Sequence, residues 1–341
     1  MGKLSEKSED ELIDRFKSAF GPPSPGEIWT GDDAAVVELG PNLVFTTDVM
    51  TEHVDFELGW ATGEDIGYKL VAVNVSDVAA MGATPGKAVA TLSVALDLDV
   101  GVVDGIVRGM QVASTRWGVD IVGGDISRAS ELSASLALLG SLEGDAVLRS
   151  TARAGDAICV TGALGGAAAG LVALRSGAVD RDALDAEFNQ PSGADALAML
   201  AVRQLRPTAR LEESRAIARL GASAMIDVSD GLAIDLNRIL TASNLGCEVA
   251  AAAVPVDPEI ALAAERVPGV LEPAHLALTG GEDFELLFTI EPDRVEDVQV
   301  ALDEIGTSVT LIGRTTEGGR KIDGEPLSSW MEDSWDHLRG R

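Results

Sequence analysis

Acidic residues that directly follow glycine recur in this chain where short apolar stretches end. Three such turns are Gly31-Asp32-Asp33, Gly123-Gly124-Asp125 and Gly280-Gly281-Glu282-Asp283. Glycine lets the backbone turn sharply and approach a phosphate or a metal ion closely. In open α/β sheets, ligands bind in the crevice beyond the ends of the strands. The recurring turns therefore favour an α/β fold whose acidic side chains lie over a binding crevice.

The chain is too long for one compact core. It has 341 residues, of which 46% are apolar, whereas single domains usually run to about 100–200 residues. An apolar strand over 157–161 follows Gly155-Asp156 and opens a new α/β pattern. We therefore expect two domains, one over 1–150 and the other over 151–341.

Apolar periodicity predicts the elements of the first domain. An amphipathic helix is expected over 9–20, and a short β-branched strand is expected over 43–47, ending at Asp48. A further helix should begin near Asp65 and end before Gly82, which suits the turn after a helix. The remaining elements predicted here are a helix over 101–117 and strands over 86–98, 119–122 and 131–143, the strand over 119–122 ending at Gly123-Gly124-Asp125.

Six aspartates lie at the ends of predicted strands or turns, or on a predicted helix face, where they could converge on one site. They are the main candidates for metal binding. Carboxylates that converge on one site repel one another unless protons or metal ions neutralise them. Oxygen ligands without a Cys or His partner favour Mg²⁺ or Mn²⁺ over zinc. A single aspartate could equally cap a helix or close a turn. The prediction therefore rests on the whole set, which is Asp33, Asp48, Asp77, Asp125, Asp227 and Asp230.

Two further features could contact phosphate, and each has a structural alternative. The loop over 161–166 follows a strand and opens a helix, so its N–H groups could face a phosphate. It lacks the lysine and the spacing of known phosphate-binding loops, and close packing of helix against strand is the favoured role. Arg149 could pair with a phosphate or form a surface ion pair. The residues alone indicate a multi-metal, phosphate-handling α/β enzyme, without a substrate.

Charge and hydropathy exclude several classes of function. The 55 acidic and 26 basic side chains give a formal net charge of -29, which repels nucleic acid and anionic membranes. No apolar run reaches the roughly 18–20 residues of a membrane span. The charged N-terminus lacks the pattern of a secretory signal, so a cytoplasmic location is expected. Cys159 and Cys247 are expected to be buried thiols.

Six motifs, in order along nearly the whole chain, resemble those of the thiamine-monophosphate kinase family. The two most specific are AVNVSDVAAMGA at 72–83 and IDVSDGL at 226–232. The other four are GDDAA at 31–35, TTD at 46–48, GGD at 123–125 and GGEDFEL at 280–286. These kinases belong to an ATP-binding superfamily that also contains aminoimidazole-ribotide synthase and selenophosphate synthetase.

The resemblance implies a two-domain α/β (α+β) fold like that of aminoimidazole-ribotide synthase. The N-terminal domain would bind ATP and Mg²⁺, and its mixed sheet would pair with that of a second subunit in a homodimer. The C-terminal α/β domain would complete the ATP and substrate site. The implied reaction is the ATP-dependent, in-line phosphorylation of thiamine monophosphate to thiamine diphosphate. ATP would be the co-substrate, and several Mg²⁺ ions would assist the transfer.

The matching motifs also assign roles to residues. The resemblance implies that the magnesium ligands are Asp33, Thr46, Thr47, Asp48, Asp77, Asp125, Asp227 and Asp230. It implies that ATP contacts Gly124, Arg149 and Ser229, and that the substrate contacts Asp55, Glu282 and Trp335. No residue is assigned as a general acid or base, because the attacking phosphate oxygen is already an anion.

One position departs from the family pattern. Where the family has a histidine before phenylalanine, this chain has Asp55 before Phe56, and His53 lies two residues earlier. An aspartate that faces a substrate phosphate is unfavourable without a metal ion. This departure leaves two alternatives open, namely another enzyme of the superfamily and a non-catalytic paralogue that binds nucleotide and metal. Selenophosphate synthetase would carry a reactive cysteine near its N-terminus, whereas no Cys precedes Cys159 here.

Overall fold

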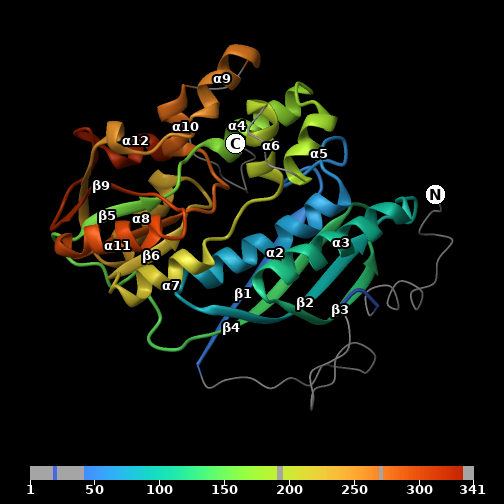
Figure 1. The fold of residues 1–341 in the computed structure, drawn as a ribbon, viewed down its shortest axis with the longest axis horizontal. Coiled ribbons are helices and arrows are strands. Elements are labelled where there is room, and N and C mark those ends of the chain that lie inside the picture. Colours follow the sequence, from blue (N-terminus) through green and yellow to red (C-terminus); the bar gives the residue numbers. More distant parts are fainter. Residues whose placement is uncertain (1–17, 21–41, 190–194, 269–271, 333–341) are drawn as a thin grey trace. The chain divides into compact units, whose positions relative to one another are not determined.

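The computed structural model describes residues 18–20, 42–189, 195–268 and 272–332, and the statements below concern these residues (Figure 1). The chain divides into two compact units. The first is Met1–Val78 with Ala83–Gly144, and the second is Ala79–Gly82 with Asp145–Arg341. Most of the helix predicted over 9–20 lies outside the described residues.

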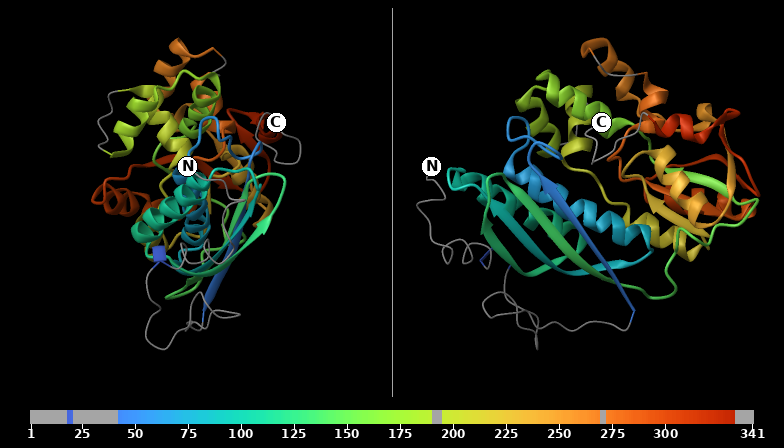
Figure 2. Two further views of the ribbon diagram at one scale, coloured as in Figure 1. Left: turned by 90° about the vertical axis from the view of Figure 1, so that its right-hand side faces the viewer. Right: turned by 180° about the vertical axis from the view of Figure 1, so that it is seen from behind.

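A four-stranded mixed sheet forms the first unit, and two helices cover one of its faces (Figures 1 and 2). The strand order is β1-β4-β2-β3, in which β2 and β3 are parallel and the other neighbours are antiparallel. The strands are β1 (Leu43–Thr51), β2 (Thr84–Val94), β3 (Asp120–Arg128) and β4 (Ser133–Ser141). The helices are α2 (Gly63–Ala80) and α3 (Val100–Trp117). The predicted mixed sheet is confirmed.

Helices α2 and α3 pack closely because glycines line their contact. A Cβ atom on Gly67 would lie 2.0 Å from the carbonyl oxygen of Ile106, and one on Gly109 would lie 2.0 Å from that of Glu64. Any larger side chain would therefore push the helices apart. Helix α2 ends as the sequence predicts, before Gly82, which has a φ of 73°.

Three predicted strand ends are wrong. The strand predicted over 86–98 ends at Val94 as β2, because its pairing with β3 ends there. Strand β1 continues through Asp48 to Thr51, because it stays paired with β4 along its whole length. Strand β3 runs from Asp120 to Arg128, so Gly124 and Asp125 lie inside it. A register shift next to Val89 lets β3 continue its pairing with β2 beyond this point. These acidic residues project from strands, and they do not end them.

The second unit is built on a seven-stranded sheet with the order β11-β10-β7-β9-β5-β8-β6. Its strands are β5 (Ala157–Thr161), β6 (Ala224–Asp227), β7 (Gly246–Val249), β8 (Leu286–Ile290), β9 (Val309–Thr316), β10 (Arg320–Ile322) and β11 (Glu325–Pro326). Strand β5 has the predicted bounds. Most neighbours in this sheet are antiparallel, and β10 and β7 are the parallel pair.

Helices and two short 3₁₀ turns connect these strands (Figure 1). They are α4 (Gly166–Ser176), α5 (Arg181–Asn189), α6 (Ala196–Leu205), α7 (Leu211–Arg219), α8 (Leu232–Ala242), η2 (Ala251–Ala253), α9 (Glu259–Arg266), α10 (Pro273–Thr279), η3 (Pro292–Arg294), α11 (Val295–Asp303) and α12 (Leu327–Met331).

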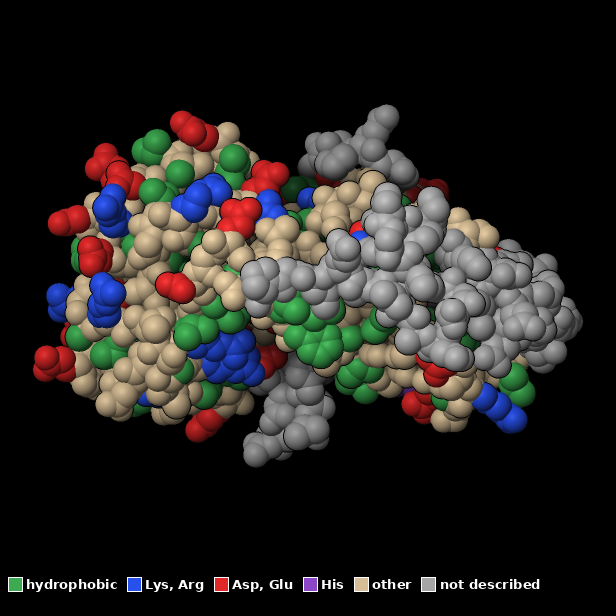
Figure 3. Space-filling model, turned by 90° about the horizontal axis from the view of Figure 1, so that it is seen from below, with side chains coloured by type: hydrophobic (Ala, Val, Ile, Leu, Met, Phe, Trp, Pro, Cys, Tyr) green, Lys and Arg blue, Asp and Glu red, His purple; other side chains and the backbone are tan. Residues whose placement is uncertain are grey.

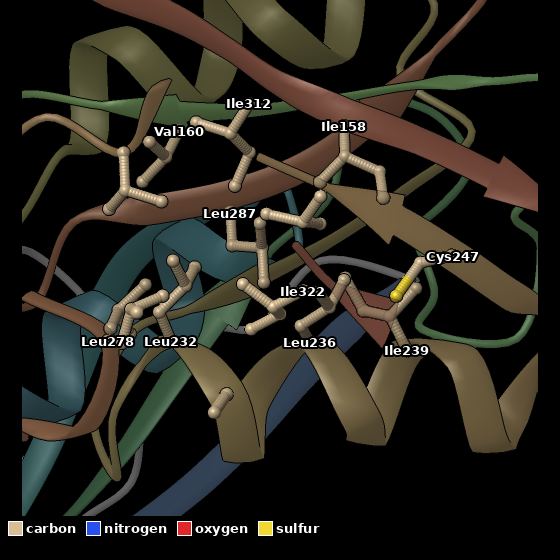
Figure 4. Packing of buried hydrophobic residues seen from close by; sticks show 14 of the residues in the cluster. Ile158, Val160, Leu232, Leu236, Ile239, Cys247, Leu278, Leu287, Ile312 and Ile322 are labelled. Carbon is tan, nitrogen blue, oxygen red and sulfur yellow. The ribbon is translucent and has the colours of Figure 1, made fainter. Parts of the chain in front are cut away.

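Residues of β5 alternate between two cores of the second unit. Ile158 and Val160 pack into one cluster, in which Leu232 and Leu236 of α8 point toward the sheet (Figure 4). Cys159, between them, belongs to another cluster with Phe288. This alternation follows from the two-residue period of a strand. Strands β5, β6 and β8 are thereby buried on both faces.

Both cysteines are buried, as expected. Burial raises the pKa of the Cys159 thiol to about 12, and burial also raises the pKa of Cys247. Acidic and basic side chains are interspersed over the visible surface (Figure 3). Among the described helices, none has a stretch both long and apolar enough to cross a membrane.

Candidate functional site

Three predicted metal ligands of the first unit face the helix-covered side of the sheet. Thr46 and Asp48 lie two residues apart on β1, so their side chains project to the same face. The Thr46 hydroxyl donates a hydrogen bond of 2.5 Å to the carboxylate of Asp77 on α2. The tertiary structure therefore brings oxygen atoms from the motifs at 46–48 and 72–83 together.

Thr47 projects to the opposite face from its two neighbours. Its hydroxyl donates to the carbonyl oxygen of Leu136 on β4 at 3.0 Å. The side chain of Thr47 thus links β1 to β4. Only its backbone lies on the side of the Thr46 and Asp48 side chains.

Asp125 lies across the sheet from Asp48, on the other edge strand. One cross-strand row joins Asp48 to Leu136, Ala90 and Gly124. The next row contains Thr91 and Asp125. Because side chains alternate along each strand, Asp48 projects to the helix-covered face and Asp125 to the open face. Within the first unit, the structure does not bring these two carboxylates together, and their shared role as metal ligands stays a prediction.

The loop after β1 uses the carboxylate of Asp55 to close a turn. One Asp55 oxygen accepts a hydrogen bond of 2.7 Å from the N–H of Thr51. The N–H of Asp55 donates in turn to the carbonyl of Thr51 at 2.9 Å. His53 has a φ of 71°, and its Nδ1 lies 2.9 Å from Glu57. That hydrogen bond raises the pKa of His53.

The motif at 226–232 is the best-defined part of the candidate site in the second unit. Asp227 is the last residue of β6 and is only 2% exposed. The buried carboxylate of Asp235 accepts hydrogen bonds of 3.0 Å from the N–H groups of Ser229 and Asp230. Arg238 bridges Asp235 and Asp230 through ion pairs. The pKa of Asp235 is raised to about 6, mainly by burial. The charge of Arg238 opposes this rise without cancelling it.

The motif at 280–286 lies directly beside the motif at 226–232. The N–H of Glu282 donates to the carbonyl of Ser229 at 2.8 Å, and that of Phe284 donates to Val228 at 2.9 Å. Both Glu282 and Phe284 have positive φ, at 68° and 51°. Such strained positions are held only where surrounding contacts fix them. The structure therefore brings together Ser229, the predicted ATP contact, and Glu282, the predicted substrate contact.

The loop over 161–166 has a structural role here. The Asp283 carboxylate accepts hydrogen bonds from the N–H groups of Gly165, at 2.6 Å, and Ala167, at 3.1 Å. An acid of the chain itself thus caps the N-terminus of α4, where a phosphate could have bound. This arrangement agrees with the favoured packing role of the loop. Burial raises the pKa of Asp283 to about 7, and the two N–H groups lower it.

Asp283 should make the stability of the protein depend on pH. Its folded pKa of about 7 exceeds the ordinary value of 3.8, so between these values the folded state holds a proton that the unfolded chain releases. The contribution of this group to stability is therefore present below about pH 4 and is lost as pH rises toward 7. Asp283→Asn should flatten the fall in unfolding free energy across this window, measured by urea denaturation.

Asp99→Asn provides the control for this experiment, because Asp99 caps the exposed N-terminus of α3 by accepting from Gly101 at 2.7 Å. This variant removes a capping carboxylate but leaves Asp283 in place, so the fall in unfolding free energy that Asp283 causes should remain. An equal slope in wild type and Asp283→Asn would show that Asp283 does not hold a proton in the folded protein.

Sequence reasoning missed a buried ionic network next to the motif at 280–286. Arg210 donates to both oxygens of Glu285, from Nε at 2.8 Å and from Nη2 at 2.5 Å. The Thr161 hydroxyl donates to the same carboxylate at 2.6 Å. Glu285 stands inside the motif, which was the one signal available from the sequence. The network fastens the end of the motif to β5 and to the start of α7.

For three residues that the family resemblance assigns to the site, the described structure shows no contact with the other motifs. Asp33 and Trp335 lie outside the described residues. Arg149 is exposed, and its carbonyl oxygen accepts a hydrogen bond of 2.8 Å from the Ser243 hydroxyl. Their predicted roles as metal, substrate and ATP contacts therefore stay predictions.

Comparison with known proteins identifies two family models that match this chain. Residues 31–142 match the AIR synthase related protein, N-terminal domain, and residues 153–323 match the AIR synthase related protein, C-terminal domain. Thiamine-monophosphate kinase of Haemophilus influenzae is 33% identical, over 97% of this chain and 98% of the relative.

Solved structures of such kinases also resemble the whole chain. Thiamine-monophosphate kinase from Stenotrophomonas maltophilia K279a superposes with a TM-score of 0.80 at 32% identity, covering 93% of this chain and 97% of the other. The structure of AaThiL complexed with AMPPCP and TMP gives a TM-score of 0.73 at 33% identity, covering 96% of each chain. The similarity therefore extends over both units and both sets of motifs.

Proposed function

This chain belongs to the thiamine-monophosphate kinases of the AIR synthase related family, and we propose that it transfers the γ-phosphoryl group of ATP to thiamine monophosphate, giving thiamine diphosphate. It is an ATP-dependent phosphotransferase. One observation of its geometry supports the proposal most: the backbone of Glu282 is hydrogen bonded to that of Ser229 at 2.8 Å. Residues proposed to bind the substrate and ATP are thereby held next to each other by the backbone.

The proposed metal ligands fit Mg²⁺ by their chemistry. Among the described residues they are Thr46, Thr47, Asp48, Asp77 and Asp125 in the first unit, and Asp227 and Asp230 in the second unit. Their side-chain ligand atoms are all oxygen, which suits a hard cation. Bound Mg²⁺ would neutralise the negative charge of these carboxylates and of the phosphates of ATP.

The residues of the chain itself contribute orientation. The attacking oxygen of thiamine monophosphate is anionic at neutral pH, so no side chain has to remove a proton from it. What the protein must supply is alignment of two negatively charged reactants. Asp235 holds the Ser229 and Asp230 amides at 3.0 Å, and the two strained residues fix the motif at 280–286. We propose that these contacts preorganise the site.

The turn of Asp55 bears on the departure from the family pattern. Its carboxylate accepts from the Thr51 N–H at 2.7 Å and so already has a role in the fold. We propose that Asp55 shapes the loop after β1 without replacing the family histidine as a phosphate contact. An aspartate used in this way does not prevent the reaction.

An assay of ATP consumption with separate candidate substrates tests the proposed function. Thiamine monophosphate, thiamine and an aminoimidazole precursor are each offered with ATP and MgCl₂. We expect ATP to be consumed when thiamine monophosphate is offered, and not when thiamine or the aminoimidazole precursor is offered. Excess EDTA should stop turnover, and Mg²⁺ or Mn²⁺ should restore it, because all proposed ligands are oxygen atoms. Full turnover in EDTA would contradict the metal assignment, and binding of ATP without turnover would indicate a non-catalytic paralogue.

We also propose that the open face of the first sheet forms a homodimer interface. Phe45 is 68% exposed and Val49 is 61% exposed on β1, and Leu43 and Val89 are exposed on the same sheet. Apolar side chains gathered on one face mark an interaction surface. The family resemblance supplies the occupant, which is the same sheet of a second copy.

Phe45→Asp should convert the proposed dimer to monomer, because it places a charge in an apolar interface. Sedimentation velocity should give a dimer for wild type and a monomer for the variant. Val300→Asp is the control, because Val300 is also exposed but lies on α11 of the second unit. A monomeric wild type, or a dimer that survives Phe45→Asp, would contradict this interface.

A further inference from the structure

Gln204 contacts Glu282 from a buried position near the end of α6. Its side chain is 1% exposed, and its Nε2 donates a hydrogen bond of 2.5 Å to an oxygen of the Glu282 carboxylate. The amide oxygen of Gln204 is also buried, and among the described residues it has no hydrogen-bond partner. Buried polar atoms are nearly always paired, so an orphaned oxygen next to a paired nitrogen requires an explanation.

The backbone fixes Glu282 independently of Gln204. Its φ of 68° is in the left-handed region, and its N–H donates to Ser229 at 2.8 Å. Phe284, two residues later, has a φ of 51°. This backbone determines where the side chain of Glu282 begins, and the amide of Gln204 determines where its carboxylate ends. Two constraints from separate parts of the chain therefore orient one carboxylate.

Fold stability alone does not explain a glutamine at position 204. A leucine would occupy a similar volume and would remove the orphaned oxygen, whose burial is unfavourable. Glu282 is half-buried, so water could replace the lost amide contact. The polar side chain thus costs stability at this position, which is a pattern found where a residue serves function.

We propose that Gln204 is a positioning residue that orients the Glu282 carboxylate toward thiamine monophosphate. The inference rests on the proposed function, in which Glu282 contacts this substrate. Thiamine monophosphate carries a cationic thiazolium ring and an aminopyrimidine, and both attract an oriented carboxylate. The phosphate end of the substrate repels it. Gln204 therefore acts on recognition of the cationic heterocycle, and ATP binding does not depend on it.

Gln204→Leu tests the proposal through the kinetic constants. The variant should raise KM for thiamine monophosphate about tenfold, as expected for the loss of one charge-assisted contact that orients a ligand. The kcat value and KM for Mg-ATP should stay unchanged. The melting temperature should be equal to or above that of wild type, because the orphaned oxygen is removed. Gln204→Met repeats the test with an unbranched side chain, so that the proposal remains testable if the Gln204→Leu protein does not fold.

A double-mutant cycle shows whether Gln204 acts through Glu282. In the Glu282→Gln background, Gln204→Leu should no longer change KM for thiamine monophosphate. Gln299→Leu is the matched control, since the Gln299 amide donates to the Val309 carbonyl at 3.1 Å on α11. This control should leave all kinetic constants unchanged.

Three results would overturn the inference. They are an unchanged KM for thiamine monophosphate in both Gln204 variants, additive effects in the cycle, or an equal rise in KM for ATP. A wild-type protein that forms no thiamine diphosphate would contradict the proposed function, and the inference with it. A working wild type with insensitive Gln204 variants would contradict the inference alone.

Discussion

Asp227→Asn is expected to abolish thiamine diphosphate formation while the protein stays folded. Asp227 is 2% exposed at the end of β6, and it is a proposed magnesium ligand. Asparagine has nearly the same shape but no charge, so it binds Mg²⁺ weakly. Because metal ions supply several kcal/mol of charge stabilisation in phosphoryl transfer, we expect kcat/KM to fall at least about a hundredfold. The melting temperature should be unchanged or higher, because one of the mutually repelling carboxylates of the proposed metal site becomes neutral.

Asp156→Asn separates this effect from the loss of any buried carboxylate. Asp156 is also buried, but it accepts from the Arg153 N–H at 2.8 Å and from the Ser223 hydroxyl at 2.5 Å, away from the motifs. Its replacement should change stability and leave kcat/KM near the wild-type value. Steady-state kinetics and calorimetric titration with Mg-ATP measure both variants. A normal rate in Asp227→Asn would remove Asp227 from the site.

Arg210→Ala is expected to destabilise the protein by about 3–5 kcal/mol, because it leaves a buried carboxylate without its partner. Arg210 donates to both oxygens of Glu285, at 2.8 and 2.5 Å, and Glu285 is buried. The pKa of Arg210 is raised by Glu285 despite burial, which keeps the guanidinium charged. Urea denaturation measures the loss. The double variant Arg210→Met with Glu285→Met should recover part of it, because both charges are then absent.

The pair of Arg314 and Glu248 provides an exposed comparison. Arg314 donates to one oxygen of Glu248, from Nε at 3.1 Å and from Nη2 at 2.7 Å, and both side chains are mostly exposed. Water solvates both charges when one is removed, so Arg314→Ala should cost less than about 1 kcal/mol. Equal losses for Arg210→Ala and Arg314→Ala would contradict the account of the buried network.

Local signals in the sequence predicted some elements well. The apolar, β-branched stretch at β5 and the glycine after α2 are patterns whose cause lies within a few residues. The ends of β1 and β3 were wrong, because strand length depends on the pairing partner. Strand β1 extends past Asp48 since β4 continues beside it as far as Ser133. Nothing near Asp48 in the sequence marks where that partner ends.

The motifs of the candidate site could be located from the sequence, but the contacts that support them could not. Asp283 caps α4 from 118 residues away, and Arg210 binds Glu285 from 75 residues away. Gln204 is 78 residues from Glu282. Each of these partners is an ordinary polar residue within its own helix or loop. Its role follows only from the tertiary structure, which places it against a motif.

The pairing register between the strands of the first sheet also could not be predicted from the sequence. The resemblance places Asp48 and Asp125 in one set of metal ligands, whereas pairing through β4 and β2 puts them in adjacent rows. A shift of one residue moves a side chain to the other face of a sheet. The register shift next to Val89 contributes to this placement, and it depends on the paired strand.

The most direct test of the central claim follows the transferred phosphoryl group. The protein is incubated with thiamine monophosphate, MgCl₂ and ATP whose γ-phosphate oxygens carry ¹⁸O, and the products are resolved by mass spectrometry. We predict thiamine diphosphate with the label in its terminal phosphate, formed in equal amounts with ADP and absent when EDTA is in excess. ATP binding without labelled thiamine diphosphate would contradict the assignment of this chain as a working thiamine-monophosphate kinase.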